Sequence, residues 1–265
     1  MNKRLARLLQ QIFLPDAPIL PHLESQNPAL PFVVRAVSTT DELLTVARLR
    51  LSVYRVAAKG EEPPLESALD VEDFAANSQV LAAIDKETNE IIGTMRIAFS
   101  SRGATTMEQL ISLPEPWRHA PYAEARLLCV PKSENSRMVL LMLCKTFFKA
   151  CRIEGVDNII IGARRAMEPF YRILCFEDVS DPPMFFSPAA NNMPHRILAL
   201  RVSQLEQIWP QHDFTENLRR MFFVQQHDDI RLGRAAPLIN PLSGMQPPSI
   251  AGKAIVVQPI ARLAR

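Results

Sequence analysis

The feature that most constrains the fold is an apolar strand followed closely by a long amphipathic helix. Residues 122–130 end in four successive apolar residues, which is typical of a strand buried on both faces at the centre of a sheet. Apolar residues at helical spacing form one stripe over 136–154, namely Leu140, Leu143, Cys144, Phe147 and Cys151. We therefore expect a central strand, then a helix with one buried face.

The other periodic segments alternate between strands and helices. We expect strands at 32–37, 79–84, 90–99, 158–161 and 196–202, and helices from a Thr40 cap, over 166–174 and over 204–225. In the strand over 90–99, alternate residues are predicted to share one face, namely Ile91, Gly93, Met95, Ile97 and Phe99. Strands that pair as hairpins between helices predict an α+β fold, a mixed sheet with helices on its faces.

The length of 265 residues suits one domain with extensions. Residues 1–31 begin with an amphipathic pattern over 1–14 and continue with five prolines, so we expect a helical arm and a linker. Residues 32–203 are expected to form the body, and 204–265 a helical extension with a basic tail. The arm packs on the body in one interpretation and contacts a membrane surface in the other.

Composition and charge exclude several classes of protein. The chain has no apolar run long enough for a transmembrane helix and no secretory signal pattern. Its net charge of +2 is too small to argue for nucleic acid. The five histidines show no ligand spacing, so no metal is expected. The four cysteines form no CxxC pair and are expected to be reduced, mostly buried thiols of a cytoplasmic protein.

Two segments resemble the GNAT acyltransferases. Residues 170–176 read FYRILCF and look like the FYxxxGF segment of those enzymes, with Cys175 in place of the glycine. Residues 123–130, followed by a loop and the long helix, resemble their central strand and cofactor-binding helix. The resemblance implies a GNAT-like mixed, mostly antiparallel sheet with helices on both faces.

Three upstream segments are similar to acyl-homoserine-lactone synthases. They read LRLSVY over 49–54, DVEDF over 70–74 and GTMRI over 93–97. A chain that joins both patterns in this order resembles the bacterial N-acyl amino acid synthases. The resemblance implies an enzyme that moves a long-chain fatty acyl group from an acyl-carrier-protein thioester to the amine of an amino acid.

The loop before the long helix bears on the acyl donor. Residues 132–137 contain no glycine where GNAT enzymes have a glycine-rich pyrophosphate loop, so the backbone leaves less room for a nucleotide diphosphate. This disfavours coenzyme A and suits a carrier-protein phosphopantetheine, although acyl coenzyme A stays an alternative donor. We expect the phosphate at the helix start, where Lys132, Ser133, Ser136 and Arg137 lie.

Aminolysis of a thioester needs a base for the amine, donors for the carbonyl oxygen and an acid for the thiolate. Glu124 is the candidate base, because desolvation on a central strand raises a carboxyl pKa, whereas Arg126 lowers it. The synthases usually have E-x-x-R on this strand, whereas Glu124 and Arg126 are two residues apart and project to one face unless a bulge intervenes. Both are candidate catalytic residues, and the alternative is a structural ion pair between them. The FYxxxGF pattern implies Tyr171 as the acid. N–H groups of 127–130 are the expected oxyanion donors, and a nucleophilic Cys129 is the weaker alternative.

Four charged residues are candidates for binding the amino acid. A guanidinium such as that of Arg50 or Arg96 grips a carboxylate bidentately, and Asp70 or Asp73 can hold the ammonium group. The resemblance implies substrate binding for all four. The alternative is a structural network of arginines and aspartates that closes the loop over the sheet, and both interpretations can hold together.

A basic segment points to a carrier protein as partner. Between Lys132 and Arg172 eight basic residues oppose four acidic ones, a net charge of +4, and a separate stripe holds Lys145, Lys149 and Arg152. Such a surface attracts an acidic carrier protein. Three other functions stay open, namely an acyl-homoserine-lactone synthase, an acetyl-coenzyme-A-dependent N-acetyltransferase and an inactive GNAT-like module that senses an acyl ligand.

Overall fold

The structure is a computed structural model, and it describes residues 26–58, 69–115, 117–179, 184–187, 193–208 and 216–233. The expected N-terminal helix over 1–14, most of the linker that follows it and most of the basic tail lie outside these residues. Within them, none of the helices combines the length and the hydropathy that a membrane crossing requires.

Nine strands and several helices alternate along the described chain. The strands are β1 (Phe32–Ala36), β2 (Ser78–Asp85), β3 (Ile91–Phe99), β4 (Tyr122–Cys129), β5 (Asn158–Arg164), β6 (Glu177–Asp178), β7 (Met184–Ser187), β8 (Met193–Arg201) and β9 (Ile230–Arg231). The helices are α2 (Thr40–Ala58), α3 (Thr106–Leu110), α4 (Ser136–Glu154), α5 (Glu168–Ile173), α6 (Val202–Ile208) and α7 (Glu216–Arg219). Short helical turns form η2 (Val71–Phe74), η3 (Ser100–Arg102) and η7 (Arg220–Val224).

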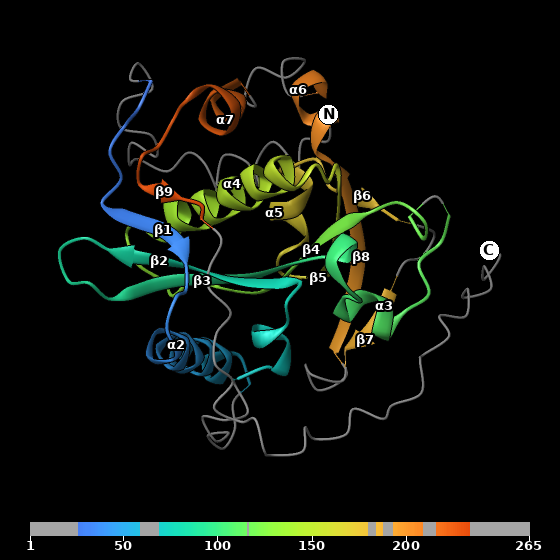
Figure 1. The fold of residues 1–265 in the computed structure, drawn as a ribbon, viewed down its shortest axis with the longest axis horizontal. Helices are drawn as coiled ribbons and strands as arrows, with labels where there is room; N and C mark the ends of the chain where they lie inside the picture. The colour runs from blue at the N-terminus through green and yellow to red at the C-terminus, as the bar shows by residue number, and fades with distance from the viewer. Residues whose placement is uncertain are drawn as a thin grey trace.

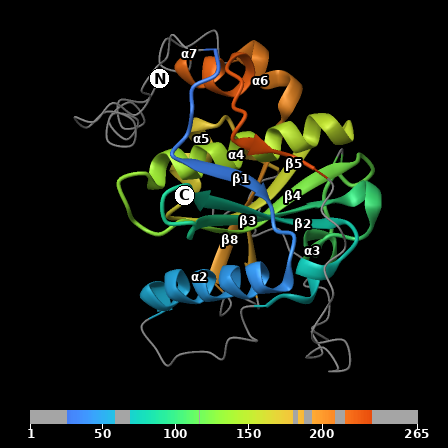
Figure 2. The same ribbon diagram turned by 60° about the vertical axis from the view of Figure 1, so that its left-hand side comes forward.

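The strands form one mixed, mostly antiparallel sheet in the order β6-β8-β5-β4-β3-β2-β1-β9, and β7 pairs with β8. Only the pairs β1 with β9 and β4 with β5 are parallel among the described strands. Helix α2 covers one face of the sheet, and α4 and α5 cover the other, with α7 on the outer side of α4 (Figures 1 and 2). The expected α+β class is confirmed.

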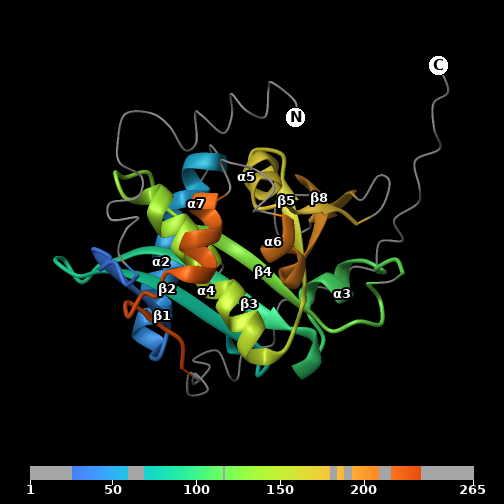
Figure 3. The same cartoon turned by 90° about the horizontal axis from the view of Figure 1, so that it is seen from above.

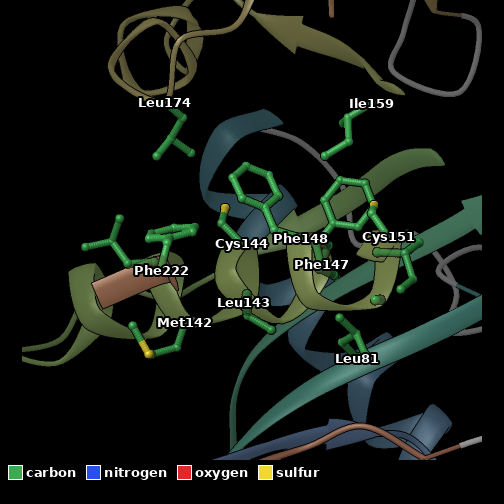
Figure 4. Packing of buried hydrophobic residues seen from close by; sticks show 14 of the residues in the cluster. Leu81, Met142, Leu143, Cys144, Phe147, Phe148, Cys151, Ile159, Leu174 and Phe222 are labelled. Carbon is green, nitrogen blue, oxygen red and sulfur yellow. The ribbon is translucent and has the colours of Figure 1, made fainter. Parts of the chain in front are cut away.

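The main core lies between the sheet and α4 (Figure 4). Leu143 and Phe147 of α4 pack there against Leu81 of β2, and Phe148 packs on Phe222 of η7 with ring centroids 5.3 Å apart. All five residues of the expected apolar stripe of α4 belong to this cluster or pack against it. The periodicity of the sequence thus predicts both the limits of α4 and the face that it buries.

A close approach between α4 and β3 explains one glycine. A Cβ atom at Gly93 would lie 2.5 Å from Cγ1 of Val139, which is nearer than real Cβ contacts occur. The absent side chain lets the first turns of α4 lie directly on the strand. Figure 3 shows α4 running across the sheet over β3 and β4. The start of α4 is therefore held against the centre of the sheet.

Three local predictions need correction. The hydroxyl of Thr39, one residue before the expected cap at Thr40, accepts the N–H of Glu42 at 3.2 Å. A register shift between β2 and β3 turns Ile91 toward the α2 face, whereas Gly93, Met95, Ile97 and Phe99 face α4 as expected. The helix expected over 204–225 is present as α6, α7 and η7, and 209–215 lie outside the described residues.

Lys145 of α4 does not lie in a solvent-facing basic stripe. Its side chain is only 5% exposed, and its Nζ donates to the backbone carbonyls of Met221 and, at 2.7 Å, Gln225. Burial lowers its pKa to about 7, with a smaller contribution from Lys149. The basic segment between Lys132 and Arg172 therefore has one surface charge fewer than its sequence indicates.

The end of the described chain completes the edge of the sheet. β9 pairs with β1, and the N–H of Val34 donates to the carbonyl of Asp229 at 2.8 Å. The Asp229 carboxylate accepts the N–H of Leu30 at 2.9 Å and pairs with Lys86 at 2.7 Å. Residues 216–231, which we expected to lie in an extension beyond 203, thus contribute to the same sheet and core.

Candidate active site

Strands β4 and β5 part in the middle of the sheet. Their parallel pairing covers only the four residues from Tyr122 to Ala125, the last of which pairs with Ile161. Beyond that point β4 pairs only with β3, and β5 pairs only with β8. Leu127 and Leu128 are consequently only partly buried, so the expectation that this half of the strand is buried on both faces is wrong. The backbone of β4 is open toward β5 here.

A β-bulge lies at the same place. Thr94 pairs with Cys129 and Arg96 with Arg126, so β4 has one more residue than β3 between the two pairs. Leu127 lies in this bulge and has a φ of 52°. This left-handed conformation is strained for a branched side chain. Bulges of this kind re-aim backbone groups next to active sites. The N–H groups expected to bind an oxyanion follow this bulge.

Glu124 lies on the face of β4 that points away from α4. It is 2% exposed, and its Oε2 accepts the N–H of Met107 at 3.0 Å. Burial raises the pKa of its carboxyl, and the Arg126 charge and the Met107 N–H offset only part of that rise. The net direction, which the sequence left open, is therefore upward. A carboxyl in this state is suited to take a proton from an amine near neutral pH.

Arg126 lies on the same face, two residues further along the strand. Its Nε is 3.8 Å from Oε1 of Glu124, and its side chain is 19% exposed. The bulge begins after Arg126, so it does not separate the two side chains. Nη1 of Arg126 is buried and has no hydrogen-bond partner among the described residues. The two residues therefore form a loosely spaced pair at the point where β4 and β5 part.

The four residues predicted to bind the substrate come together in one buried network next to Glu124. Arg50 of α2 grips Asp73 of η2 through both oxygens, at 2.6 and 3.1 Å. Arg96 of β3 pairs with Asp70 at 2.8 Å and with Glu72 at 2.8 Å. Both arginines are 1% exposed, so each has its charge matched by carboxylates inside the protein.

The local sequence of η2 explains how the carboxylates converge. Asp70 caps this short helix by accepting the N–H of Glu72, and the Asp73 carboxylate accepts the N–H of Asp70. This is a capping box, which the D-x-x-D spacing predicts. Glu72, to which the sequence analysis gave no role, also accepts the hydroxyl of Thr106. Burial opposes the ionisation of Asp70, but Arg96, the N–H of Glu72 and the charge of Arg126 together outweigh burial and lower the pKa of that carboxyl.

Tyr171 lies on the other face of the sheet. It belongs to α5 and packs against the core below α4, with its ring 5.4 Å from those of Phe170 and Phe176. Burial raises the pKa of its phenol, so it keeps its proton at neutral pH. Glu124 faces away from that core, so the sheet separates the two residues except where β4 and β5 part. Cys175, in place of the family's glycine, takes a φ of 65°.

The predicted phosphate site is the start of α4. Lys132, Ser133 and Arg137 are exposed, and Ser136 is half-buried with its hydroxyl donating to the carbonyl of Ser133 at 2.9 Å. The N-cap residue, Asn135, makes no side-chain cap bond. N–H groups of a first helical turn have no partner inside the helix, so they point toward a potential anion. These residues lie apart from the Arg50 network, on the α4 side of the sheet.

Metal chemistry finds no support in the described residues. They hold no group of three or more histidine, cysteine, aspartate or glutamate side chains that is arranged to bind a metal ion. The acidic residues of η2 are committed to Arg50 and Arg96 instead. None of the four cysteines, all of which lie among the described residues, forms a disulfide bond, and three of them are buried.

A mixed sheet that parts between two parallel central strands, with a buried carboxylate beside the opening, defines the GNAT-like acyltransferase fold. The sequence profile of the N-acyl amino acid synthase FeeM family matches residues 45–199. The chain therefore belongs to this family of N-acyltransferases.

Solved structures agree with this assignment in fold. FeeM, an N-acyl amino acid synthase from uncultured soil microbes, is 16% identical, with a TM-score of 0.54 over 68% of this chain and 96% of FeeM. BjaI, a coenzyme-A-dependent acyl-homoserine lactone synthase, is 15% identical, with a TM-score of 0.53 over 76% of this chain and 95% of BjaI. No curated protein matches the chain by sequence.

Proposed function

We propose that the protein joins a long-chain fatty acyl group to the amine of an amino acid and takes the acyl group from an acyl-carrier-protein thioester. The observation that carries the proposal is the buried Glu124, with its raised pKa, beside the point where β4 and β5 part. A thioester that enters between the strands would present its carbonyl to the open backbone of β4. An amine that approaches from the α2 face would meet Glu124.

The proposed reaction exchanges a C–S bond for a C–N bond. Glu124 takes one proton from the ammonium group, and the neutral amine attacks the thioester carbonyl. The negative charge that develops on the carbonyl oxygen is stabilised by N–H groups that follow the bulge at Leu127. When the intermediate collapses, the C–S bond breaks and the thiolate takes a proton from the phenol of Tyr171. The nitrogen, which still carries two protons after the attack, loses the second one to solvent as the amide forms. Return of the Glu124 proton to solvent, and a proton from solvent to Tyr171, close the cycle, so that the reaction releases one proton overall.

Two features support a carrier-protein donor. The loop before α4 has no glycine, and its exposed Lys132 and Arg137 suit the single phosphate of phosphopantetheine. Exposed basic residues nearby, such as Lys149 and Arg165, would attract the acidic surface of a carrier protein. Because Lys145 is buried, this surface has one positive charge fewer than the sequence indicates, but its net charge is still positive. Coenzyme A is the alternative donor, and the assay below distinguishes the two.

The Arg50 network has a narrower role in this proposal. Because Arg50, Arg96 and Asp73 are almost fully buried and mutually paired, we propose that they hold η2 against the sheet beside Glu124. Asp70 is the exception, because its side chain is 34% exposed. It is the member of the predicted substrate-binding set that is best placed to meet an incoming ammonium group.

The proposal is tested by incubating the full chain with acyl-carrier-protein thioesters of several chain lengths and a mixture of amino acids. Mass spectrometry should detect N-acyl amino acids. Parallel reactions with acyl coenzyme A and acetyl coenzyme A identify the donor, and consumption of S-adenosylmethionine would indicate a lactone synthase instead. Glu124→Gln should abolish the product, whereas Glu87→Gln, in the exposed β2–β3 turn, should not. Absence of any acylated amine with all donors would overturn the proposal.

A further inference from the structure

We propose that Arg126 binds the carboxylate of the acceptor and so restricts the acceptor to α-amino acids with a free carboxylate. This inference rests on the proposed function, because it assigns the residue that would select the amino acid. From the sequence, Arg126 is expected among the catalytic residues, and Arg50 and Arg96 are expected to bind the carboxylate. The contacts of the three arginines support a different division of roles.

The first argument is that Arg50 and Arg96 already have carboxylate partners. Both carboxylate oxygens of Asp73 accept hydrogen bonds from the Arg50 guanidinium. The carboxylates of Asp70 and Glu72 form ion pairs with Arg96. A substrate carboxylate could reach either guanidinium only by displacing a buried ion pair, which is strongly unfavourable. Neither arginine is therefore available for a substrate without a rearrangement of η2.

The second argument is that Arg126 has unused binding capacity. Its nearest carboxylate, Glu124, is 3.8 Å from Nε, which is too far for a hydrogen bond. Its Nη1 is buried without a hydrogen-bond partner among the described residues. A buried guanidinium N–H without an acceptor is unfavourable, and a carboxylate oxygen is the strongest acceptor that can satisfy it.

The third argument is the charge around Arg126. His195 of β8 lies opposite Arg164 of β5 in register, on the far side of the opening between β4 and β5. Burial lowers the pKa of His195, and the charges of Arg164 and Arg126 lower it further. Both arginines therefore lie near enough to act on the same imidazole. Arg126 and Arg164 therefore place two positive charges on this face of the opening, beside the carboxyl groups of Glu124 and Asp70, and these guanidinium groups favour an anionic group of the substrate.

The fourth argument is the spacing of Glu124 and Arg126. An α-amino acid has its ammonium and carboxylate groups on one carbon atom, so its two charges lie only a few ångströms apart. Glu124 and Arg126 present the opposite charges on one face of β4, 3.8 Å apart. An acceptor with its nitrogen at Glu124 would place its carboxylate at Arg126. A β-amino acid would separate the two groups by one more carbon and fit less well.

The test compares acceptors that differ only in the carboxylate. The amino acid that the wild-type protein acylates best is assayed against its primary carboxamide and its β-homologue, with the donor saturating. The wild type should prefer the free acid to the carboxamide. Arg126→Gln should raise KM for the free acid about 10- to 100-fold and remove the preference, with little change for the carboxamide. Arg126→Lys should keep part of the preference, because lysine has the positive charge but lacks the planar guanidinium group that can pair with both oxygens of a carboxylate.

Matched controls separate this inference from the proposed function. Arg48→Gln, on the exposed side of α2, should leave KM and acceptor preference unchanged. Circular dichroism checks that the Arg126 variants fold. If Arg126→Gln does not fold, the acceptor preference of Arg126→Lys decides whether the inference holds. If the wild type acylates no amine, the proposed function fails. If it acylates amino acids and folded Arg126 variants lower kcat for acid and carboxamide alike, with the preference intact, only the inference about Arg126 is overturned.

Discussion

The two faces of the sheet bury different kinds of side chain. On the α4 face, the core consists of side chains such as Leu143, Phe147 and Ile159, all almost fully buried. On the α2 face, apolar residues such as Leu43 and Val46 are buried as well, but β3 and β4 also bury Arg96 and Glu124, and α2 adds Arg50. Apolar burial stabilises a fold without regard to direction, whereas buried charges require matched partners. The comparison indicates that apolar packing stabilises the α4 face, whereas the α2 face combines apolar packing with paired charges beside the proposed site.

The largest effect on activity is expected from Glu124→Gln. The amide has the same shape and can still accept the N–H of Met107, but it cannot take a proton. We expect kcat/KM for amino acid acylation to fall by about 10²–10⁴-fold. The unfolding temperature, measured by calorimetry, should change by only a few degrees. A fall in the unfolding temperature of much more than a few degrees would mean that Glu124 is needed for the fold rather than for catalysis.

The pH profile provides a second readout for Glu124. Because its pKa is raised above the usual carboxyl range, the base is lost as the pH falls through that raised value. The wild-type rate should therefore rise with pH over this window. The residual rate of Glu124→Gln should lack that limb, and if it keeps the limb, another group is the base.

The largest effect on stability is expected on the α2 face. Asp73→Ala would leave the Arg50 guanidinium buried without its bidentate partner and remove one carboxylate from Arg96. Breaking a buried ion pair in this way costs about 3–5 kcal/mol of unfolding free energy. Urea denaturation measures it, and a double variant that also changes Arg50 to Met should regain part of the loss. Full additivity of the two changes would show that the pair does not interact.

A core substitution on the α4 face should separate stability from activity. Leu143→Ala removes buried methyl groups between α4 and the sheet and should lower the unfolding free energy by about 2–5 kcal/mol. The rate per folded molecule should stay close to that of the wild type at temperatures where the variant is folded. A large change in KM for the acceptor would contradict the division between the two faces.

The smallest expected effect concerns the one lysine buried in the α4 layer among the described residues. Because burial lowers the pKa of Lys145 to about 7, the unfolded chain binds more protons than the folded one above pH 7. The unfolding free energy should therefore rise between about pH 7 and 10. His227 acts in the same direction at lower pH, since burial and Lys145 lower its pKa to about 4. Lys145→Met should flatten the profile above pH 7, and at lower pH it should reduce the part of the His227 effect that comes from the Lys145 charge.

Local patterns predicted the parts of the fold that depend on local physics. The limits of α4 follow from its periodicity and from Gly155, which ends the helix in a left-handed conformation. The hairpin of β2 and β3 follows from alternation and a polar turn. The face of the sheet on which Ile91 lies could not be predicted in this way, because the register shift at Ala83 and Ile84 has no signal in either strand alone.

Contacts between distant segments were less predictable. Lys145 has the spacing of an exposed stripe, but its partners lie 76 and 80 residues further along the chain. The capping box of Asp70 and Asp73 is visible in the sequence, whereas its pairing with Arg50 is not. At Glu124 both influences on the pKa, burial and the Arg126 charge, could be predicted. Their balance could not, because it depends on how completely neighbouring elements exclude water.

The pairing of β9 with β1 has a consequence for how the protein is made. A ribosome synthesises β9 some two hundred residues after β1, so the outer edge of β1 lacks this partner strand over that interval. Open strand edges invite pairing with other chains. The nascent polypeptide is therefore open to pairing with other chains along β1 until β9 has left the ribosome.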